Sequence, residues 1–574
     1  MLAPSFVLIA AVMVLPLVLG DFWAFQLGLY YLYAIAALGI GVCWGQAGFL
    51  PLGQAMFFGL SAYLSGFALI YFEDSWWLLA LLPLAALVSG MLAYGIGLLV
   101  FRARTESGPY FSLITLAISL LVFQIANNWN QVTGGFNGLK GIPGLPGLGE
   151  YRDTYYVAAV ALSAAGLALA WLFAAPLGIL WRAVAQNERR VAFFGFSTTQ
   201  LKAVAFGLSG LLGGIAGTIY APQQGLVTPQ LCGFILSADL VIWAAVGGRN
   251  SLLGPIAGAL AVGLITSELR DRIFFWEVIL AFFFIVVVLY FPNGIVGALD
   301  PVRRRLPRRR GAAPARRAPA REARSEPVQL DIAGISARVG EVLILDDLWL
   351  LIDRPGIFCI IGPNGAGKTS TFNLVTGELK AQGGRVALDG STITGLAPER
   401  VIRRGVGRKF QIPNIFPGLG IRDNLHIALW SGRVRPWALL QPRLRTWTSP
   451  LLQELEQRYP FLADRGRQAQ QLSHGERQIL ELAMALITEP RLLLLDEPCA
   501  GLSAEETATV IEVIRWAALR LGATIIIIEH DMSLVKELAQ HVFVLHQGKL
   551  LAEGSVAQIQ ANPAVQAVYV GGSK

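Results

Sequence analysis

The stretch Gly362-Pro-Asn-Gly-Ala-Gly-Lys-Thr-Ser370 decides the fold of one part of this chain. It matches the pattern G-x-x-x-x-G-K-[ST], follows the apolar run Ile357–Ile361 and precedes a predicted helix over Thr369–Thr376. This context predicts a loop whose backbone N–H groups wrap phosphates at a helix N-terminus, where the helix dipole favours anions. We expect Lys368 to reach the β- and γ-phosphates of ATP and Thr369 to bind Mg²⁺. The predicted nucleotide contacts are Gly362, Pro363, Asn364, Gly365, Ala366, Gly367, Lys368, Thr369 and Ser370.

An acidic pair closes the apolar run Leu492–Pro498 (LLLLDEP), which predicts a buried strand. After a phosphate-binding loop, Asp496 is the predicted carboxylate for Mg²⁺, and Glu497 is the predicted general base for the attacking water. Adjacent residues on a strand point to opposite faces. The two roles therefore require the chain to bend out of the strand at this point.

Between these two motifs lies Leu472–Gln478 (LSHGERQ), which resembles the signature motif that defines ABC ATPases among P-loop proteins. His474 stands where glycine is usual in that motif, and Glu476 stands where glutamine is usual. The Ser473 hydroxyl and the N–H groups around Gly475, at a helix start, retain what binding a γ-phosphate needs. The resemblance implies that Ser473, Gly475 and Glu476 contact nucleotide, in a site completed by a second ATPase domain.

Two more residues match ABC ATPase positions by their order along the chain. Gln411, in Gly407–Pro413, takes the place of the glutamine that touches Mg²⁺ and water and senses the permease. His530 follows the predicted strand Thr524–Ile528 and matches the switch histidine that contacts the γ-phosphate. The resemblance thus implies catalytic roles for Glu497, His530 and Gln411, and metal contacts from Thr369, Gln411 and Asp496.

Two positions depart from that family pattern. Val339 lies where an aromatic residue usually stacks on adenine, which predicts weak base stacking or stacking supplied elsewhere. Ser503 replaces the usual aspartate in the loop after Glu497, which puts communication between two ATP sites in question.

The composition requires a second solvent for the first half of the chain. Mean hydropathy is +0.55 over 574 residues, only 15% are charged, and Phe22–Phe72 carries no charge at all. Residues 1–300 hold about eight to ten hydrophobic segments, with Met1–Gly20 expected as the first span. Asp239 is a candidate functional charge inside the membrane, or it faces a loop or a partner helix. The predicted fold class is a polytopic α-helical membrane domain followed by an α/β P-loop NTPase domain.

Residues 301–326 read as a linker, since ten arginines and three prolines lie between Arg303 and Arg324. A basic segment directly after the last apolar run fits the positive-inside rule and attraction to anionic lipid, so nucleic-acid binding is not expected. Basic short-loop residues place Arg102, Arg182 and Lys202 on the same side, predicted to be cytoplasmic, as is the ATPase domain over 327–574. The loops Thr133–Pro146 and Pro222–Pro229 then lie on the opposite side.

The polar stretch Arg182–Gly195 places Glu188, Ala192 and Gly195 at the spacing of the coupling loop in ABC importer permeases, which it resembles. With YFSLIT at Tyr110–Thr115 and the segment Asn187–Ala221, the first 295 residues resemble the permease of branched-chain and hydrophobic amino-acid importers. The segments GRKFQIPNIF (407–416) and VLHQGKLLAEGS (544–555) also resemble ATPases of the related urea and short-amide importers. The substrate class stays open between these alternatives.

The resemblance implies a plasma (inner) membrane importer subunit that uses ATP and Mg²⁺ and fuses one permease to one ATPase. Its expected partners are a second permease and a second ATPase, or a second copy of itself, with an extracytoplasmic solute-binding protein. The rival interpretations are an ABC exporter half-transporter and a membrane-anchored regulatory ABC ATPase. Exporters typically have six long spans and lack a coupling loop like Arg182–Gly195.

Overall fold

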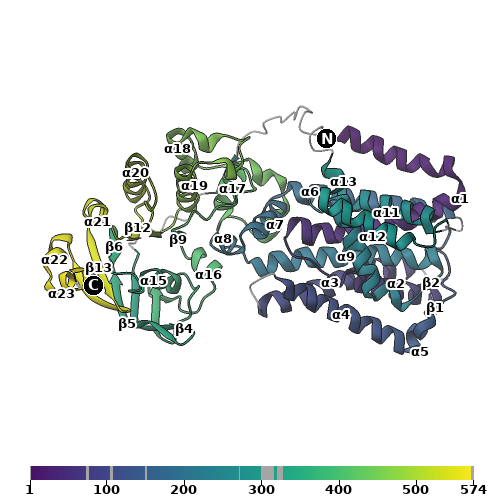
Figure 1. The fold of residues 1–574 in the computed structure, drawn as a ribbon, viewed down its shortest axis with the longest axis horizontal. Coiled ribbons are helices and arrows are strands. Elements are labelled where there is room, and N and C mark those ends of the chain that lie inside the picture. Colours follow the sequence, from purple (N-terminus) through teal and green to yellow (C-terminus); the bar gives the residue numbers. More distant parts are fainter. Residues whose placement is uncertain are drawn as a thin grey trace. The chain divides into compact units, whose positions relative to one another are not determined.

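The computed structural model divides the chain into two compact units, each treated by itself (Figure 1). The first comprises Met1–Ala185 with Thr198–Ala312, and the second comprises Gln186–Ser197 with Ala313–Lys574. The twelve residues Gln186–Ser197 therefore pack with the second unit, although both chain neighbours belong to the first. The structure describes residues 2–72, 77–103, 108–148, 151–270, 272–291, 293–298, 316–319 and 328–570.

The first unit is built from helices. The described part holds six helices long and apolar enough to cross a membrane, together with two shorter apolar ones. A break at Gly20, with φ of 79°, interrupts the first helix, and the span predicted at Met1–Gly20 falls on side chains outside the described set. The helices are α1 (Leu2–Ile40), α2 (Gln54–Tyr71), α3 (Leu78–Ala103), α4 (Pro109–Asn128), α5 (Asn130–Thr133), α6 (Tyr151–Ala174), α7 (Pro176–Gln186), α9 (Thr198–Gln224), α10 (Phe234–Gly247), α11 (Gly254–Arg270), α12 (Trp276–Tyr290) and α13 (Gly294–Gly297).

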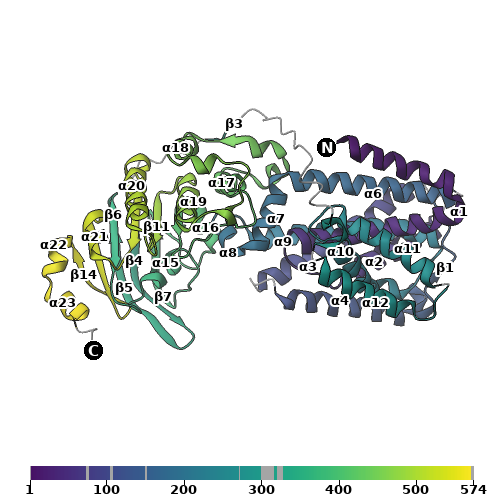
Figure 2. The ribbon, with the colours of Figure 1, turned by 45° about the horizontal axis from the view of Figure 1, so that its top comes forward.

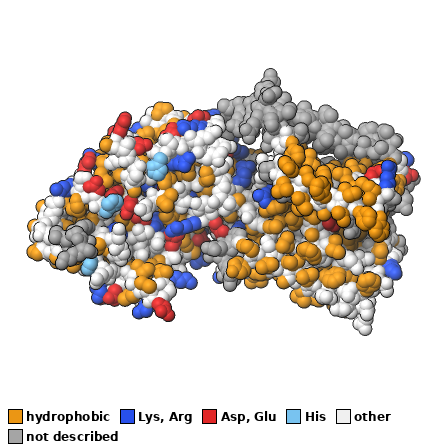
Figure 3. Space-filling model, in the orientation of Figure 1, with side chains coloured by type: hydrophobic (Ala, Val, Ile, Leu, Met, Phe, Trp, Pro, Cys, Tyr) orange, Lys and Arg blue, Asp and Glu red, His pale blue; other side chains and the backbone are white. Residues whose placement is uncertain are grey.

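The six long helices fall into an inner and an outer set. The most apolar windows of Gly20–Gln46, Gln54–Tyr71 and Thr198–Gln224 are 83%, 72% and 67% buried, whereas those of α3, α4 and α6 are 33%, 22% and 28% buried. Hydrophobic side chains cover the visible face of this unit (Figure 3). A surface of this kind suits lipid or a partner helix and not water.

Glycines let the inner helices approach closely. A Cβ on Gly217 of α9 would lie 2.0 Å from the carbonyl oxygen of Phe58 on α2. Small residues at such crossings are how membrane helices gain packing contacts when lipid offers no hydrophobic driving force. Polar groups at the same contact satisfy each other, since the Gln54 amide donates to the Ser209 carbonyl at 2.7 Å and accepts from its hydroxyl at 2.8 Å.

The two loops predicted to share one side of the membrane meet each other. Strand β1 (Leu139–Lys140) pairs antiparallel with β2 (Leu226–Val227), and the Ile142 N–H donates to the Gly225 carbonyl at 3.2 Å. At the other ends of the helices, Lys202 lies over the ring of Phe101 at 4.6 Å, next to Arg102. The predicted grouping of the loops therefore agrees with the fold of this unit.

The described part of the second unit contains two main sheets and one small two-stranded sheet (Figure 2). A six-stranded sheet has the order β14-β13-β6-β12-β11-β9, and a four-stranded antiparallel sheet has the order β5-β4-β7-β8. The strands are β4 (Leu330–Val339), β5 (Val342–Ile352), β6 (Ile357–Ile361), β7 (Gly383–Leu388), β8 (Ser391–Thr392), β9 (Val406–Lys409), β11 (Leu492–Asp496), β12 (Thr524–Ile528), β13 (His541–His546) and β14 (Lys549–Gly554), with a small parallel pair of β3 (Arg316–Arg317) and β10 (Trp447–Thr448).

Helices accompany these sheets in the second unit (Figures 1 and 2). They are α8 (Glu188–Ala192), α15 (Lys368–Val375), α16 (Pro398–Arg403), α17 (Ile421–Trp430), α18 (Pro450–Arg458), α19 (His474–Ile487), α20 (Ala504–Leu521), α21 (Met532–Leu538), α22 (Val556–Ala561) and α23 (Pro563–Val570).

The central parallel strands position the site. Strands β6, β11 and β12 are buried along their whole length, as expected for apolar strands covered on both faces. The strands predicted at Ile357–Ile361 and Thr524–Ile528 match β6 and β12. Because β6, β12 and β11 are parallel neighbours, the loops after them leave from the same sheet edge.

Candidate nucleotide site

The phosphate-binding loop joins β6 to α15 with three glycines in left-handed conformations. Gly362, Gly365 and Gly367 have φ of 151°, 82° and 97°. A Cβ on Gly362 would lie 2.2 Å from the carbonyl oxygen of Leu545, so this position accepts no side chain. The Lys368 ammonium donates to the carbonyls of Gly362 and Pro363 at 2.7 and 3.0 Å, which folds it over the loop.

The predicted metal carboxylate lies beside the predicted metal hydroxyl. Thr369 Oγ1 is 3.5 Å from Asp496 Oδ1, and Arg408 approaches the other carboxylate oxygen at 3.7 Å. Asp496 is 3% exposed. Burial raises the pKa of the Asp496 carboxyl, and the Arg408 guanidinium opposes that rise. Hydroxyl and carboxylate oxygens side by side are the donors that Mg²⁺ takes in phosphoryl-transfer sites, so these residues fit that ion.

Glu497 leaves the sheet where the sequence requires it. Strand β11 ends at Asp496, and Glu497 has φ of 43°, which is the predicted bend. The Gln411 amide donates to Glu497 Oε2 at 2.8 Å, and His530 Nδ1 lies 3.7 Å from Glu497 Oε1. The structure therefore brings Gln411, Glu497 and His530 together beside Asp496 and the phosphate-binding loop.

Ser473 begins α19 as a capping residue. Its hydroxyl accepts from the Glu476 N–H at 3.2 Å, and Glu476 Oε2 accepts from the Ser473 N–H at 2.8 Å. Arg467 holds the same carboxylate through bonds of 2.7 and 2.8 Å. Glutamate in the usual glutamine position thus completes a capping box and an ion pair.

The second departure, Ser503, has the same local role on α20. Its hydroxyl accepts from the Glu506 N–H at 3.3 Å, and its own N–H donates to Glu506 at 3.0 Å. A Cβ on Gly475 would lie 2.1 Å from Glu506 Oε1, so the two helix starts touch. His474 Nε2 lies 3.7 Å from the Cβ position of Gly501 in the intervening loop. The signature residues and the loop after Glu497 therefore form one contact.

The segment Gln186–Ser197 is seated in the second unit by polar and aromatic contacts. The side-chain oxygen Oε1 of Gln186 accepts a hydrogen bond from the Gly418 N–H at 2.7 Å. The Arg403 side chain donates to the Gly195 carbonyl at 2.8 Å. The Phe193 and Phe410 rings meet edge to face, with centroids 4.9 Å apart. Among the three residues predicted for the coupling loop, Glu188 and Ala192 are half-buried, and Gly195 is buried with φ of 77°.

Arg190 makes the deepest contact of this segment. Its side chain is 1% exposed, it donates to the Arg408 carbonyl at 2.9 Å, and it lies 3.5 Å from the fully buried Glu481 of α19. Glu481 also accepts from the Phe410 N–H at 3.3 Å. Sequence reasoning missed Arg190 and Glu481, although a basic pair at 189–190 in a segment predicted to dock was a usable signal.

Two other predicted residues lie apart from these contacts. Val339 is 56% exposed at the end of β4, where it offers an apolar surface and no ring. Asp239 is half-buried on α10 of the first unit. That placement leaves its role in the membrane unit a prediction.

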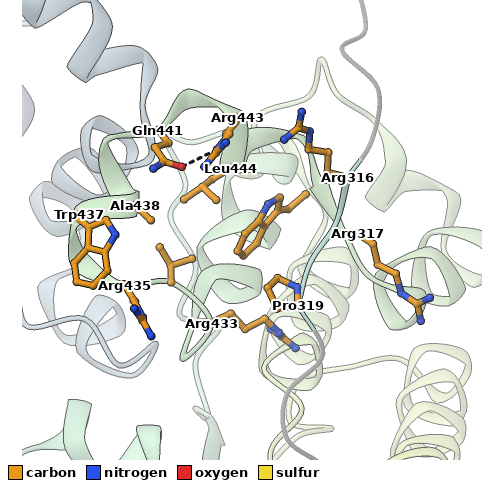
Figure 4. A pocket seen from close by; sticks show the side chains of 12 residues that line it. Arg316, Arg317, Pro319, Arg433, Arg435, Trp437, Ala438, Gln441, Arg443 and Leu444 are labelled. Atoms are coloured by element: carbon orange, nitrogen blue, oxygen red, sulfur yellow. Dashed lines mark hydrogen bonds between the residues drawn. The ribbon is translucent and has the colours of Figure 1, made fainter.

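A pocket of about 540 Å³ in the second unit is lined by none of the predicted site residues (Figure 4). Arginines on the linker strand β3 and on the segment after α17 surround it, with the Trp437 and Trp447 rings. Arg433, also in its lining, is paired with Glu489 at 3.0 Å. The pocket is basic and separate from the nucleotide site.

The fold and the site define the class of this protein, an ABC-type P-loop ATPase joined in one chain to a multi-pass helical membrane unit. Residues 23–290 match the family model of the branched-chain amino acid transport system permease component, and residues 332–500 match that of the ABC transporter. Residues 549–574 match the model of the branched-chain amino acid ATP-binding cassette transporter. The chain belongs to the branched-chain amino acid ABC transporter family, with the permease and the ATPase fused.

Relatives match the second half. The high-affinity branched-chain amino acid transport ATP-binding protein LivG of Escherichia coli is 35% identical over 258 residues, which cover 43% of this chain and 99% of LivG. BraF of Pseudomonas aeruginosa, with the same description, is 34% identical over 257 residues, 43% of this chain and 99% of BraF. A crystal structure of a nucleotide-free ATP-binding cassette from an ABC transporter aligns with TM-score 0.36 and 26% identity, covering 42% of this chain and 98% of that one.

Proposed function

We propose that this chain imports branched-chain amino acids, or related small solutes, across the plasma (inner) membrane at the cost of ATP. The main support for this proposal is that one chain matches both the permease model and the ATPase models of this family. LivG and BraF, the relatives of the second half, are named as branched-chain amino acid transport proteins. Seating Gln186–Ser197 in the ATPase unit supports energy transfer between the two functions.

The proposed assembly contains two ATPase units and two permeases. The chain has one phosphate-binding loop and one signature motif. Membership of the ABC family implies that the signature motif of one ATPase unit completes the nucleotide site of another. The partners are a second permease and a second ATPase, or a second copy of this chain. An extracytoplasmic binding protein delivers the solute.

The proposed chemistry follows from the side chains around the loop. Lys368 leaves its loop carbonyls for the β- and γ-phosphates of ATP, and Glu497 takes a proton from the attacking water. Gln411 and His530 orient that water and the γ-phosphate. Thr369, Asp496 and Gln411 would hold Mg²⁺, which when bound neutralises charge developing on the phosphates.

Coupling is assigned to the segment Gln186–Ser197. Its seat lies on β9, which ends two residues before Gln411, and on α19, which begins at the signature motif. Closure of two ATPase units around ATP moves α19 and β9, and the buried Arg190–Glu481 pair transmits this to the helices flanking the segment.

Uptake by reconstituted vesicles tests the proposal. Proteoliposomes with internal ATP are prepared from the chain, its partner permease, its partner ATPase and their binding protein. The entry of labelled leucine, isoleucine, valine and urea is then followed. ATP-dependent leucine entry that requires the binding protein supports the proposal, and entry of urea alone reassigns the substrate. ATP-dependent efflux indicates an exporter, and ATPase activity without transport of any solute indicates a regulatory ATPase.

A further inference from the structure

Three side chains connect the segment Gln186–Ser197 to the metal carboxylate without passing through Gln411. Arg189 of that segment donates to Glu378 Oε2 at 2.6 Å, and Arg408 donates to the same oxygen at 3.0 Å. The other terminal nitrogen of Arg408 lies 3.7 Å from Asp496 Oδ2. We name Arg189–Glu378–Arg408–Asp496 the charge ladder, and all of it lies in the second unit.

Exposure falls along the ladder from Arg189 to the buried Arg408 and Asp496, with Glu378 partly buried between them. The side chains of Arg408, Asp496 and Glu378 are 1%, 4% and 15% exposed, whereas that of Arg189 is 53% exposed. Ion pairs out of water are screened weakly by salt and depend strongly on their partners. A change in the partners of Arg408 therefore changes the electrostatic interaction between Arg408 and Asp496.

Arg408 is fixed by contacts on several sides. It donates to the Thr376 hydroxyl at 3.1 Å, just beyond the end of α15, the helix that begins with Lys368. Its guanidinium stacks over the Phe410 ring at 4.7 Å, and its backbone carbonyl accepts from Arg190. Arg408 thus joins the phosphate-loop helix, the strand before Gln411 and the docked segment.

The carboxylate of Glu378 accepts hydrogen bonds from both Arg189 and Arg408. While Arg189 is seated, Arg408 shares Glu378 with it and keeps a second carboxylate, Asp496. When Arg189 withdraws, the whole charge of Glu378 is available to Arg408 and draws it from Asp496. Asp496 then loses the Arg408 guanidinium from one carboxylate oxygen, while Thr369 stays beside the other.

We propose that Arg408 is a positioning residue, which sets the orientation of the Asp496 carboxylate according to whether Arg189 is docked on Glu378. This rests on the proposed function, because it gives the segment Gln186–Ser197 a signalling role. It adds a second route to the ATP site, independent of the contact between Gln411 and Glu497.

Double-mutant cycles test the ladder in the full chain, assembled with its partners in lipid nanodiscs. The variants are Arg189→Gln, Glu378→Gln, Arg408→Gln, Arg408→Lys and the doubles Arg189→Gln/Glu378→Gln and Glu378→Gln/Arg408→Gln. Each is measured for kcat, for KM of ATP, for half-saturating Mg²⁺ and for affinity of the fluorescent analogue TNP-ATP in EDTA. The exposed pair Arg385–Asp331, tested as Arg385→Gln, is the control.

We expect Arg189→Gln and Arg408→Gln to lower kcat by about tenfold and to raise half-saturating Mg²⁺, whereas Glu378→Gln, which leaves Arg408 with Asp496, stays near the parental values. Arg189→Gln/Glu378→Gln should recover the parental kcat, and Glu378→Gln/Arg408→Gln should match Arg408→Gln. Arg408→Lys keeps the charge and recovers part of kcat. TNP-ATP affinity in EDTA stays at the parental value, since Asp496 acts only with the metal. Arg385→Gln leaves all four quantities unchanged.

The ladder would be overturned if Arg189→Gln kept the parental kcat, or if Arg189→Gln/Glu378→Gln kept the loss of kcat seen in Arg189→Gln. A loss of TNP-ATP affinity in EDTA as large as the loss of kcat would also overturn it. If Arg408→Gln does not fold, the Arg189–Glu378 cycle alone decides the question. Failure of leucine uptake with intact cycles refutes the proposed substrate and leaves the ladder standing.

Discussion

The side-chain amide of Gln411 donates a 2.8 Å hydrogen bond to the carboxylate of Glu497, which has left its strand with φ of 43°. This contact joins Gln411, two residues after the end of β9, to Glu497, the residue that follows β11, and those strands are parallel neighbours. The group predicted to sense the permease therefore touches the group predicted to activate water.

Replacing Glu497 by Gln keeps the bond acceptor but removes the base. We expect ATP hydrolysis to fall by on the order of 10³-fold, within the range of a lost general base, while TNP-ATP binding is retained. Steady-state phosphate release and fluorescence titration measure the two quantities. Glu553→Gln, an exposed glutamate of β14, is the matched control. Retained hydrolysis in Glu497→Gln would contradict the assignment.

Glu481→Ala removes the buried anion that faces the buried guanidinium of Arg190. We expect a loss of about 3–5 kcal/mol of stability in the second unit, because buried cations remain without a counter-ion. The midpoint of thermal unfolding, followed by intrinsic fluorescence, reports this loss. Glu512→Ala, which breaks the surface pair with Arg458, should cost less than about 1 kcal/mol. Equal effects of both variants would show that burial of the pair has no consequence.

Ser503→Ala removes the hydroxyl that caps α20, and we expect a loss of about 1 kcal/mol. Ser503→Asp keeps a capping oxygen, so its stability should stay near that of the parent. Chemical denaturation of the full chain in detergent, followed at the second unit, compares the three proteins. A stability order with the Asp variant lowest would show that the position is kept for another reason.

His426 gives the second unit a pH-dependent stability. Burial first, then Arg422, lowers the pKa of His426 to about 4, and its Nε2 lies 3.2 Å from the Trp447 carbonyl oxygen. The unfolded chain, with a pKa of about 6.5, binds more protons between these values. Stability is therefore full above about pH 6.5 and is lost as pH falls toward 4, by on the order of 3 kcal/mol.

The matching measurement is the unfolding midpoint between pH 7.5 and 4.5 for the parent and for His426→Phe. The variant should lose less stability than the parent over this range, since it has no group to protonate there. Parallel slopes for the two proteins would contradict a neutral buried His426.

Much of the nucleotide site could be predicted because its parts are local. The strand at Ile357–Ile361, the loop glycines and the acidic pair at Asp496 and Glu497 each follow from short-range backbone chemistry. The capping boxes at Ser473 and Ser503 were also readable as Ser-x-x-Glu. Ser473 was predicted only as a nucleotide contact, Glu476 as a nucleotide contact and a departure from a family pattern, and Ser503 only as such a departure, so the capping of both helix starts was missed.

The sequence by itself determined the division into an apolar and a soluble half, the phosphate-binding loop and the family. These features depend on composition and on residues adjacent in the chain. Only the tertiary structure decided that Gln186–Ser197 packs with the ATPase unit, and that Arg190, Glu378, Arg408 and Glu481 surround its seat. Those residues are far apart in sequence. The fold brings them together as ion pairs, because a buried charge without a counter-ion is strongly destabilising.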